Sequence, residues 1–142
     1  MDSKRIFVYG SLMKGFYNYE KFLKGKTINE ISGTSIEGKL FHLPKKGYPA
    51  VISGKDIISG QVLDVIDNGK IFEEINQMEG VISLNNPKNE YNIEIREVKF
   101  LDGSREYLPV YIYNSIEDEI VNNDLGIYIS SGDWKLYMTE KK

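Results

Sequence analysis

The sequence predicts an α+β domain whose sheet curls into a small barrel. Short runs rich in Ile, Val, Tyr and Phe alternate with Gly, Pro, Asn and Asp, which is typical of strands joined by turns. A single segment, ending before Gly80, has clear helical periodicity. Because many short strands must pair over long range around one helix, closure into a small barrel is the favoured arrangement.

The first predicted strand is Ile6-Phe7-Val8-Tyr9, and it runs directly into the loop Gly10–Gly15. The strand residues suit a buried, pleated position, and the two glycines permit backbone conformations closed to other residues. Such a loop lets a ligand approach the main chain and presents N–H donors to an anionic or carbonyl-bearing ligand. A short helix over residues 18–24, ending at Gly25, is expected to follow.

Strands are predicted next at residues 36–43 and 50–52, on either side of a turn at 44–47, and again at 57–66. The last of these contains Gly60, and a glycine within a strand indicates a bulge or a close backbone approach.

The clearest helix is predicted to begin at Asp67 or Asn68, both good N-cap residues, and to end at Gly80. Its apolar residues fall on one face. These are Ile71, Phe72, Ile75 and Met78.

A hairpin is predicted from residues 91–101 and 105–113 around the turn Asp102-Gly103. The apolar residues of its first arm change phase along the strand, which predicts a bulge near Arg96 and Glu97. The second arm ends in Val110–Tyr113, which is apolar on both faces, as in a central strand.

Composition excludes several classes of function. The 142 residues include no cysteine and one histidine, His42. Thiolate metal sites are therefore excluded, and the chain has too few histidines for a zinc site built from several of them. A net charge of −3, with both signs interspersed, indicates neither a nucleic-acid partner nor a polybasic membrane anchor. No apolar stretch approaches the roughly 20 residues that span a bilayer. We therefore expect one soluble, cytoplasmic domain over residues 1–142, and the lack of an obvious exposed apolar stripe favours a monomer.

Glu79 is the carboxylate that the pattern singles out. It lies at the C-terminal end of the predicted helix, where the helix dipole disfavours another anion, and it follows the apolar residues Ile75 and Met78. Both effects raise the pKa of a carboxyl group, which suits general acid–base catalysis near neutrality. The plain alternative is a solvated surface acid, the default in a chain with 21 acidic residues.

Several motifs resemble those of the γ-glutamylcyclotransferase-like superfamily. Tyr9-Gly10-Ser11-Leu12 is similar to its Tyr-Gly-[Ser/Thr]-Leu signature, and Met13-Lys14-Gly15 with Asn18 extends the likeness toward the γ-glutamylamine cyclotransferase branch. Further matches follow in order: Gly47-Tyr48-Pro49-Ala50-Val51, Gly60-Gln61-Val62, Met78-Glu79-Gly80, Tyr91, Tyr111 to Tyr113 and Ser131-Gly132-Asp133-Trp134. Each motif is weak alone, and the order and spacing make the match specific. The resemblance implies a small mixed β-barrel with flanking short helices.

The reaction implied by the resemblance releases pyroglutamate (5-oxoproline) from a γ-glutamyl amine or γ-glutamyl peptide. The free α-amine attacks its own γ-carbonyl and expels the attached amine, so proximity is built into the substrate. Glu79 matches the family's catalytic glutamate and would act as general acid and base. Tyr9 and the backbone of Gly10, Ser11 and Leu12 would bind the substrate carboxylate and the oxyanion. No metal or organic cofactor is required.

Tyr91 and Tyr113 match family positions near the site and are expected to bind substrate. For each tyrosine the alternative is core packing. Many relatives carry an arginine two residues after the first of these tyrosines, where this chain has Ile93. Arg96 is the nearest arginine, and the sequence leaves open whether it substitutes.

Other interpretations remain at this point. A non-catalytic domain that binds an amino-acid-like ligand is the main one, although such a binder gains nothing from an acid, Glu79, beside its anion. Ser11 is expected to bind rather than to act as a nucleophile, and His42 is expected at a strand end on the surface. The loop Gly10–Gly15 lacks the Gly-Lys-[Ser/Thr] ending of a phosphate loop. Trp134 is expected as a packed indole beside a turn. The leaving amine is not determined, and removal of a γ-glutamyl cap from a secondary metabolite would differ only there.

Overall fold

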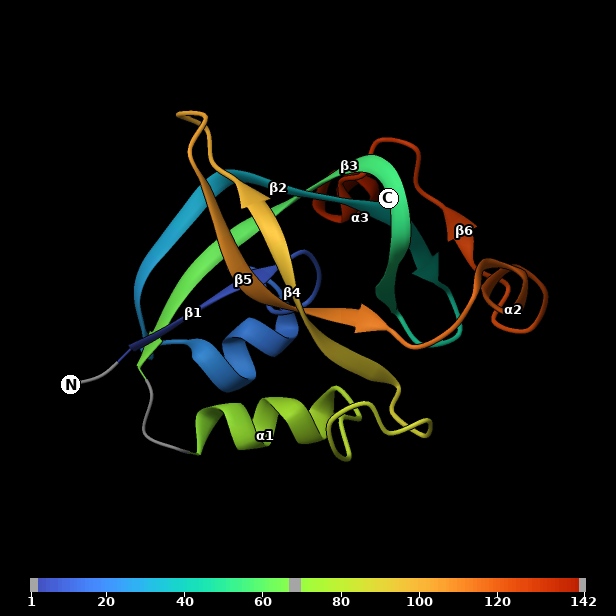
Figure 1. Ribbon diagram of the computed structural model, residues 1–142, viewed down its shortest axis with the longest axis horizontal. Helices are drawn as coiled ribbons and strands as arrows, with labels where there is room; N and C mark the ends of the chain where they lie inside the picture. The colour runs from blue at the N-terminus through green and yellow to red at the C-terminus, as the bar shows by residue number, and fades with distance from the viewer. Residues whose placement is uncertain (1–2, 67–69, 141–142) are drawn as a thin grey trace.

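The computed structural model describes residues 3–66 and 70–140, and Figure 1 shows how their elements are arranged. The expected helix start at Asp67 or Asn68 lies outside the described residues. The elements are β1 (Ser3–Val8), the one-turn π-helix η1 (Tyr19–Leu23), β2 (Thr27–Leu43), β3 (Tyr48–Ile66), α1 (Ile71–Met78), β4 (Tyr91–Lys99), β5 (Arg105–Tyr113), α2 (Glu117–Asn122), β6 (Ile127–Tyr128) and α3 (Trp134–Glu140). The predicted α+β class is confirmed.

The strands form one sheet in the order β1-β3-β2-β4-β5, and β6 pairs with β2. β2 and β3 are long, curved strands where the sequence predicted three short ones (Figure 1). They bend without ending because their register shifts at bulges, as between Gly38 and Lys39. At that bend a Cβ on Gly54 would lie 2.9 Å from the carbonyl carbon of Gly38, so the sharp bend depends on two glycines in contact.

The predicted closure into a barrel is not shown. All strand pairs found are antiparallel, and within residues 3–66 and 70–140 no backbone pairing joins β1 to β5. Side chains bridge these two strands instead: Arg5 Nη1 lies 2.7 Å from Glu106 Oε2, and the Tyr9 hydroxyl donates to the Tyr111 carbonyl at 2.6 Å. Pro109 of β5 has no N–H to donate, which is typical of an edge strand.

The hairpin of β4 and β5 is confirmed, but the bulge near Arg96 and Glu97 is absent because the two strands pair in one unbroken register. The phase change has another cause. Tyr91 at the start of β4 is buried, whereas Ile95 on the same face is 63% exposed and Val98 on the opposite face is fully buried, so the core covers opposite faces of β4 at its two ends. Val110–Tyr113 is buried on both faces as expected, yet β5 lies at the end of the sheet order.

The C-terminal elements α2, β6 and α3 were not predicted, and they bury one end of β2. Trp134 is a packed indole, as expected, with its ring 4.9 Å from that of Phe16. Its indole N–H donates to Nδ1 of His42 at 3.1 Å. The expected surface position of His42 is therefore wrong: the side chain is 3% exposed because the segment from β6 to α3 covers it.

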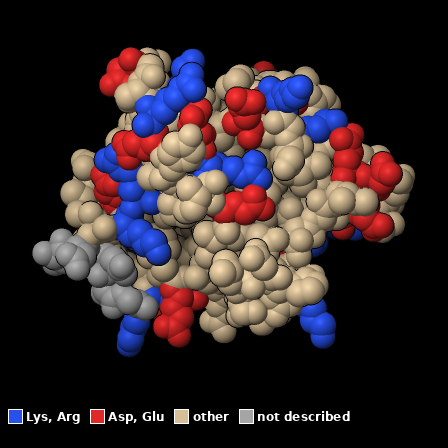
Figure 2. Space-filling view, in the orientation of Figure 1, with Lys and Arg blue, Asp and Glu red and all other residues tan. Residues whose placement is uncertain are grey.

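Acidic and basic side chains are interspersed on the face in Figure 2, with a largely uncharged area over the C-terminal half of α1 and the loop after it. No helix among those described is both long and apolar enough to cross a membrane.

Candidate active site

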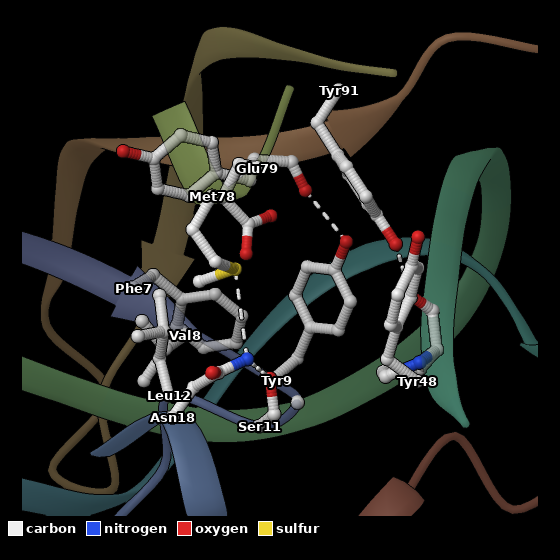
Figure 3. Close-up of a pocket in the computed structure, with 13 residues that line it drawn as sticks. Phe7, Val8, Tyr9, Ser11, Leu12, Asn18, Tyr48, Met78, Glu79 and Tyr91 are labelled. Atoms are coloured by element: carbon white, nitrogen blue, oxygen red, sulfur yellow. Dashed lines mark hydrogen bonds between the residues drawn. The ribbon is translucent and has the colours of Figure 1, made fainter. Parts of the chain in front are cut away.

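A pocket opens where the loop after β1 meets the C-terminal end of α1 and the first residues of β3 and β4 (Figure 3). It encloses about 460 Å³, part of which is open to solvent. The residues that the sequence singled out line it, with one exception: Tyr9, Gly10, Ser11, Leu12, Glu79 and Tyr91. Tyr113 is not part of this wall, and its ring packs edge-on behind that of Tyr91, with the ring centroids 5.1 Å apart.

Glu79 is positioned by the way α1 ends. The helix stops as predicted, because Gly80 takes a φ of +71°, a conformation that a residue with a Cβ rarely adopts. The N–H of Val81 then donates to the carbonyl of Asn76 at 2.9 Å, and the N–H of Gly80 to that of Gln77 at 3.2 Å. This is the Schellman pattern, and it satisfies carbonyls that the helix end would otherwise leave unpaired.

The carboxylate of Glu79 points into the pocket beside the Met78 side chain (Figure 3). Across the described parts of the chain, no side chain or backbone group forms a hydrogen bond or ion pair with it. Burial raises the pKa of this carboxyl group from 4.5 to about 8, and the nearby negative charge of Glu90 adds to the effect. A carboxyl group of this kind can both give and take a proton near neutral pH.

Two tyrosine hydroxyls in the pocket wall have a fixed polarity. Tyr9 donates its proton to the carbonyl of Tyr111, and Tyr91 donates to the carbonyl of Pro49, each at 2.6 Å. Burial raises the pKa of both hydroxyls well above the ordinary value, so both stay neutral. With its proton committed, each oxygen has only lone pairs left to offer a ligand.

The loop after β1 contains three adjacent N–H groups for which residues 3–66 and 70–140 provide no acceptor. The N–H of Met13 donates to the carbonyl of Gly10 at 2.9 Å and the N–H of Lys14 to Oε1 of Gln61 at 2.9 Å, and these bonds hold the shape of the loop. For the N–H groups of Gly10, Ser11 and Leu12, no acceptor is found within residues 3–66 and 70–140. These residues are buried, and buried N–H groups are nearly always paired, so the row indicates a place for an anion or a carbonyl oxygen.

Asn18 belongs to the site although it was proposed only as part of a motif. Its Nδ2 donates to Oγ of Ser11 at 2.7 Å and lies 3.6 Å from Sδ of Met78. The Ser11 hydroxyl therefore accepts from Asn18 and keeps its own proton for a ligand. The imidazole Nδ1 of His42 is bonded to Trp134, away from this wall, so the arrangement supports a binding role for Ser11.

Gly10 has a packing reason to be glycine. A Cβ at this position would lie 2.6 Å from Cγ of Pro49, closer than such atoms approach. The space beside Gly10 is thus filled by Pro49, so ligand approach is not the only requirement that this glycine meets.

Tyr48 and Tyr111 also line the pocket, and neither was proposed as a site residue. Tyr111 donates its hydroxyl to Oδ1 of Asn76 on α1. In the sequence, both residues lie within motifs that resemble those of the family, and these matches could have identified them. In contrast, Arg96 pairs with Glu94 and does not line the pocket, so it does not supply a cation there. The described residues contain no group of three or more His, Cys, Asp or Glu suited to a metal ion.

Comparison with known proteins gives a consistent family and fold. Residues 6–136 match the family model described as gamma-glutamyl cyclotransferase, AIG2-like. No curated protein matches. Three similar solved structures are an uncharacterized protein, PH0828, of Pyrococcus horikoshii (27% identity, 98% of this chain and 96% of that chain, TM-score 0.61), an AIG2-like protein of Mus musculus (18%, 83% and 82%, 0.62) and allophanate hydrolase of Kluyveromyces lactis (16%, 100% and 22%, 0.67).

Proposed function

Because this chain belongs to the gamma-glutamyl cyclotransferase, AIG2-like family, we propose that it releases pyroglutamate from a γ-glutamyl amine or γ-glutamyl peptide. One observation carries the proposal. Within the described residues, the Glu79 carboxyl group and the N–H groups of Gly10–Leu12 have no hydrogen-bond partner, and they lie in one pocket. A carboxyl group in this position would not help a non-catalytic site to bind an anion. Intramolecular aminolysis, in contrast, needs both the carboxyl group and the N–H donors.

The hydrogen-bond donors and acceptors of the pocket wall determine where each polar group of the substrate binds. The α-ammonium group meets acceptors, namely Glu79 and the hydroxyl oxygens of Tyr9 and Tyr91. The carboxylate and the γ-carbonyl oxygen meet the N–H donors and the Ser11 hydroxyl. Donors and acceptors in one pocket would hold the amine against the carbonyl carbon, which is the geometry that the reaction requires.

In the proposed reaction Glu79 takes a proton from the ammonium group and the freed amine attacks the γ-carbonyl carbon. The N–H donors stabilise the oxyanion that forms. As the γ-amide C–N bond breaks, the carboxyl proton is returned to the leaving nitrogen, and the ring nitrogen passes its second proton to the same amine, which departs as an ammonium ion. The products are pyroglutamate and the released amine.

The test is incubation with glutathione, γ-glutamyl-alanine and γ-glutamyl-ε-lysine, followed by an assay for pyroglutamate, with Glu79→Gln as the matched inactive control. Pyroglutamate from at least one compound, lost in the variant, supports the proposal. If no compound is converted while titration calorimetry detects binding of glutamate-like ligands, the chain is instead the non-catalytic binding domain of the same fold. We further propose that the protein acts as a monomer on a small-molecule γ-glutamyl substrate, and gel filtration tests the monomeric state.

A further inference from the structure

An ion pair that the proposed chemistry does not use lies at the mouth of the pocket. Nζ of Lys46, on the turn between β2 and β3, is 2.7 Å from Oε2 of Glu90, which immediately precedes β4. The same oxygen accepts the hydroxyl proton of Tyr48, a residue of the pocket wall. The two charged side chains are about one third exposed, at 35% and 28%.

Glu90 is fixed against the residue that follows Glu79. Its N–H donates to the carbonyl of Gly80 at 3.0 Å, and its carbonyl accepts from the N–H of Asn114 at 2.9 Å. The two residues are in such close contact that a Cβ on Gly80 would lie 2.8 Å from Cβ of Glu90. The backbone therefore holds a second carboxylate close to Glu79.

Among the described residues that line the pocket, the other titratable groups near Glu79 are tyrosines. Tyr9, Tyr48, Tyr91 and Tyr111 face it from the ends of β1, β3, β4 and β5, and all four hydroxyls stay neutral because burial raises the pKa of each above the ordinary value. Glu90 is the other carboxylate whose charge Glu79 meets.

Lys46 balances that second carboxylate. Besides its bond to Glu90, Nζ of Lys46 donates to the hydroxyl of Tyr113 at 3.3 Å, and this hydroxyl is 3.2 Å from Oδ2 of Asp124. Lys46 is thus paired directly with Glu90 and connected to Asp124 through the Tyr113 hydroxyl.

We propose that the Lys46–Glu90 ion pair is a positioning element of this site, which holds Tyr48 on the pocket wall and sets the charge that Glu79 meets. The inference rests on the proposed function only for its kinetic consequence. It predicts that the two halves of one ion pair have opposite effects. Removing the charge of Glu90 relieves repulsion, so Glu79 gives up its proton more easily, whereas removing the charge of Lys46 leaves Glu90 unbalanced, so Glu79 holds its proton more tightly.

The direct test follows the ionisation of Glu79 by carbon NMR in protein labelled at glutamate carboxyl groups, with the Glu79 signal assigned by its loss in Glu79→Gln. Glu90→Gln should lower the midpoint and Lys46→Met should raise it, each by about half a pH unit. Lys45→Met removes an exposed charge from the same turn and is the matched control, with no expected shift. Lys46→Arg keeps the charge and should restore the wild-type midpoint.

Opposite shifts support the proposal, since a purely structural ion pair would be broken equally by both substitutions. Shifts in the same direction, or no shift in folded variants, overturn it. If either variant fails to fold by circular dichroism, it is replaced by Glu90→Ala or Lys46→Gln, which also remove one charge and must shift the midpoint in the same direction as the variant they replace. Where substrate turnover is detected, the acid limb of kcat/KM should move with the midpoint. Because the titration needs no substrate, a failed proposed function and a failed positioning role are distinguishable.

Discussion

Replacing Glu79 by glutamine should make the protein more stable at neutral and basic pH. The folded protein binds the Glu79 proton more tightly than the unfolded chain, because burial raises the pKa from 4.5 to about 8. The stabilisation linked to this proton is complete below the unfolded pKa and is lost as the pH rises through the folded value. Glutamine resembles the protonated acid and does not ionise, so the variant avoids that loss.

The magnitude follows from the two pKa values. Over the interval from 4.5 to about 8, wild type should lose about 1.4 kcal/mol of unfolding free energy per pH unit relative to Glu79→Gln. The total, about 5 kcal/mol, is an upper limit, since the residue is partly exposed and water that reaches the carboxylate reduces the cost of charging it.

Urea unfolding of both proteins at several values between about pH 5 and pH 9 measures this difference, and contributions from other titrating groups cancel in the subtraction. Glu73→Gln, on the exposed face of the same helix, is the control for removing a carboxylate from α1. A pH-independent difference for Glu79→Gln would refute the reasoning, because it would mean that the carboxyl group ionises in the folded protein as freely as in the unfolded chain. The same variant should lose about two to four orders of magnitude in turnover while keeping substrate binding, and near-wild-type turnover would remove Glu79 from the mechanism.

Three further predictions concern the loop and the chemistry. Activity should be the same in EDTA, because the proposed reaction uses a carboxyl group and N–H donors; loss that a divalent ion restores would point to a metal-assisted reaction instead. Gly10→Ala should lower the free energy of unfolding by about 1–3 kcal/mol in urea, because its Cβ would lie 2.6 Å from Pro49, and unchanged stability would show that Pro49 moves aside. Ser11→Ala should fold normally and weaken calorimetric binding of a slowly converted γ-glutamyl analogue by about 1–3 kcal/mol. If Ser11→Ala reduces turnover as much as Glu79→Gln, the hydroxyl takes part in the chemistry.

The parts of the site that could be predicted from the sequence are those set by local rules. Helical spacing and a glycine at the C-terminal end are enough to put Glu79 at the end of α1, and an apolar strand followed by small residues is enough to place the loop at 10–15. The direction of the pKa change of Glu79 follows from the same local pattern. Local rules failed where a residue contacts another that is distant in the sequence. His42 is buried by Trp134, 92 residues later, and no pattern around His42 indicates this contact.

The same limit explains the errors in the sheet. The prediction for residues 91–101 assumed that one face of the strand is buried throughout, so the change of phase of its apolar residues was interpreted as a bulge. In the structure β4 and β5 pair without a shift, and Ile95 is exposed instead. Residues 50–52 and 57–66 were predicted as separate strands, whereas both lie in β3, which continues through residues 53–56. In the folded chain these residues form a bend between two strands that stay paired on either side, which depends on contact between Gly38 and Gly54.

The charge around Glu79 is set by residues that are far apart in the sequence. Lys46 and Glu90 are 44 residues apart, and they meet because the turn between β2 and β3 packs against the segment before β4. A helix end with apolar neighbours explains why a carboxyl group resists ionisation, but it cannot say how much repulsion a second carboxylate adds or how much a lysine cancels. Opposite shifts of the Glu79 midpoint in Glu90→Gln and Lys46→Met would therefore measure the part of this site's electrostatics that arises only when the chain folds.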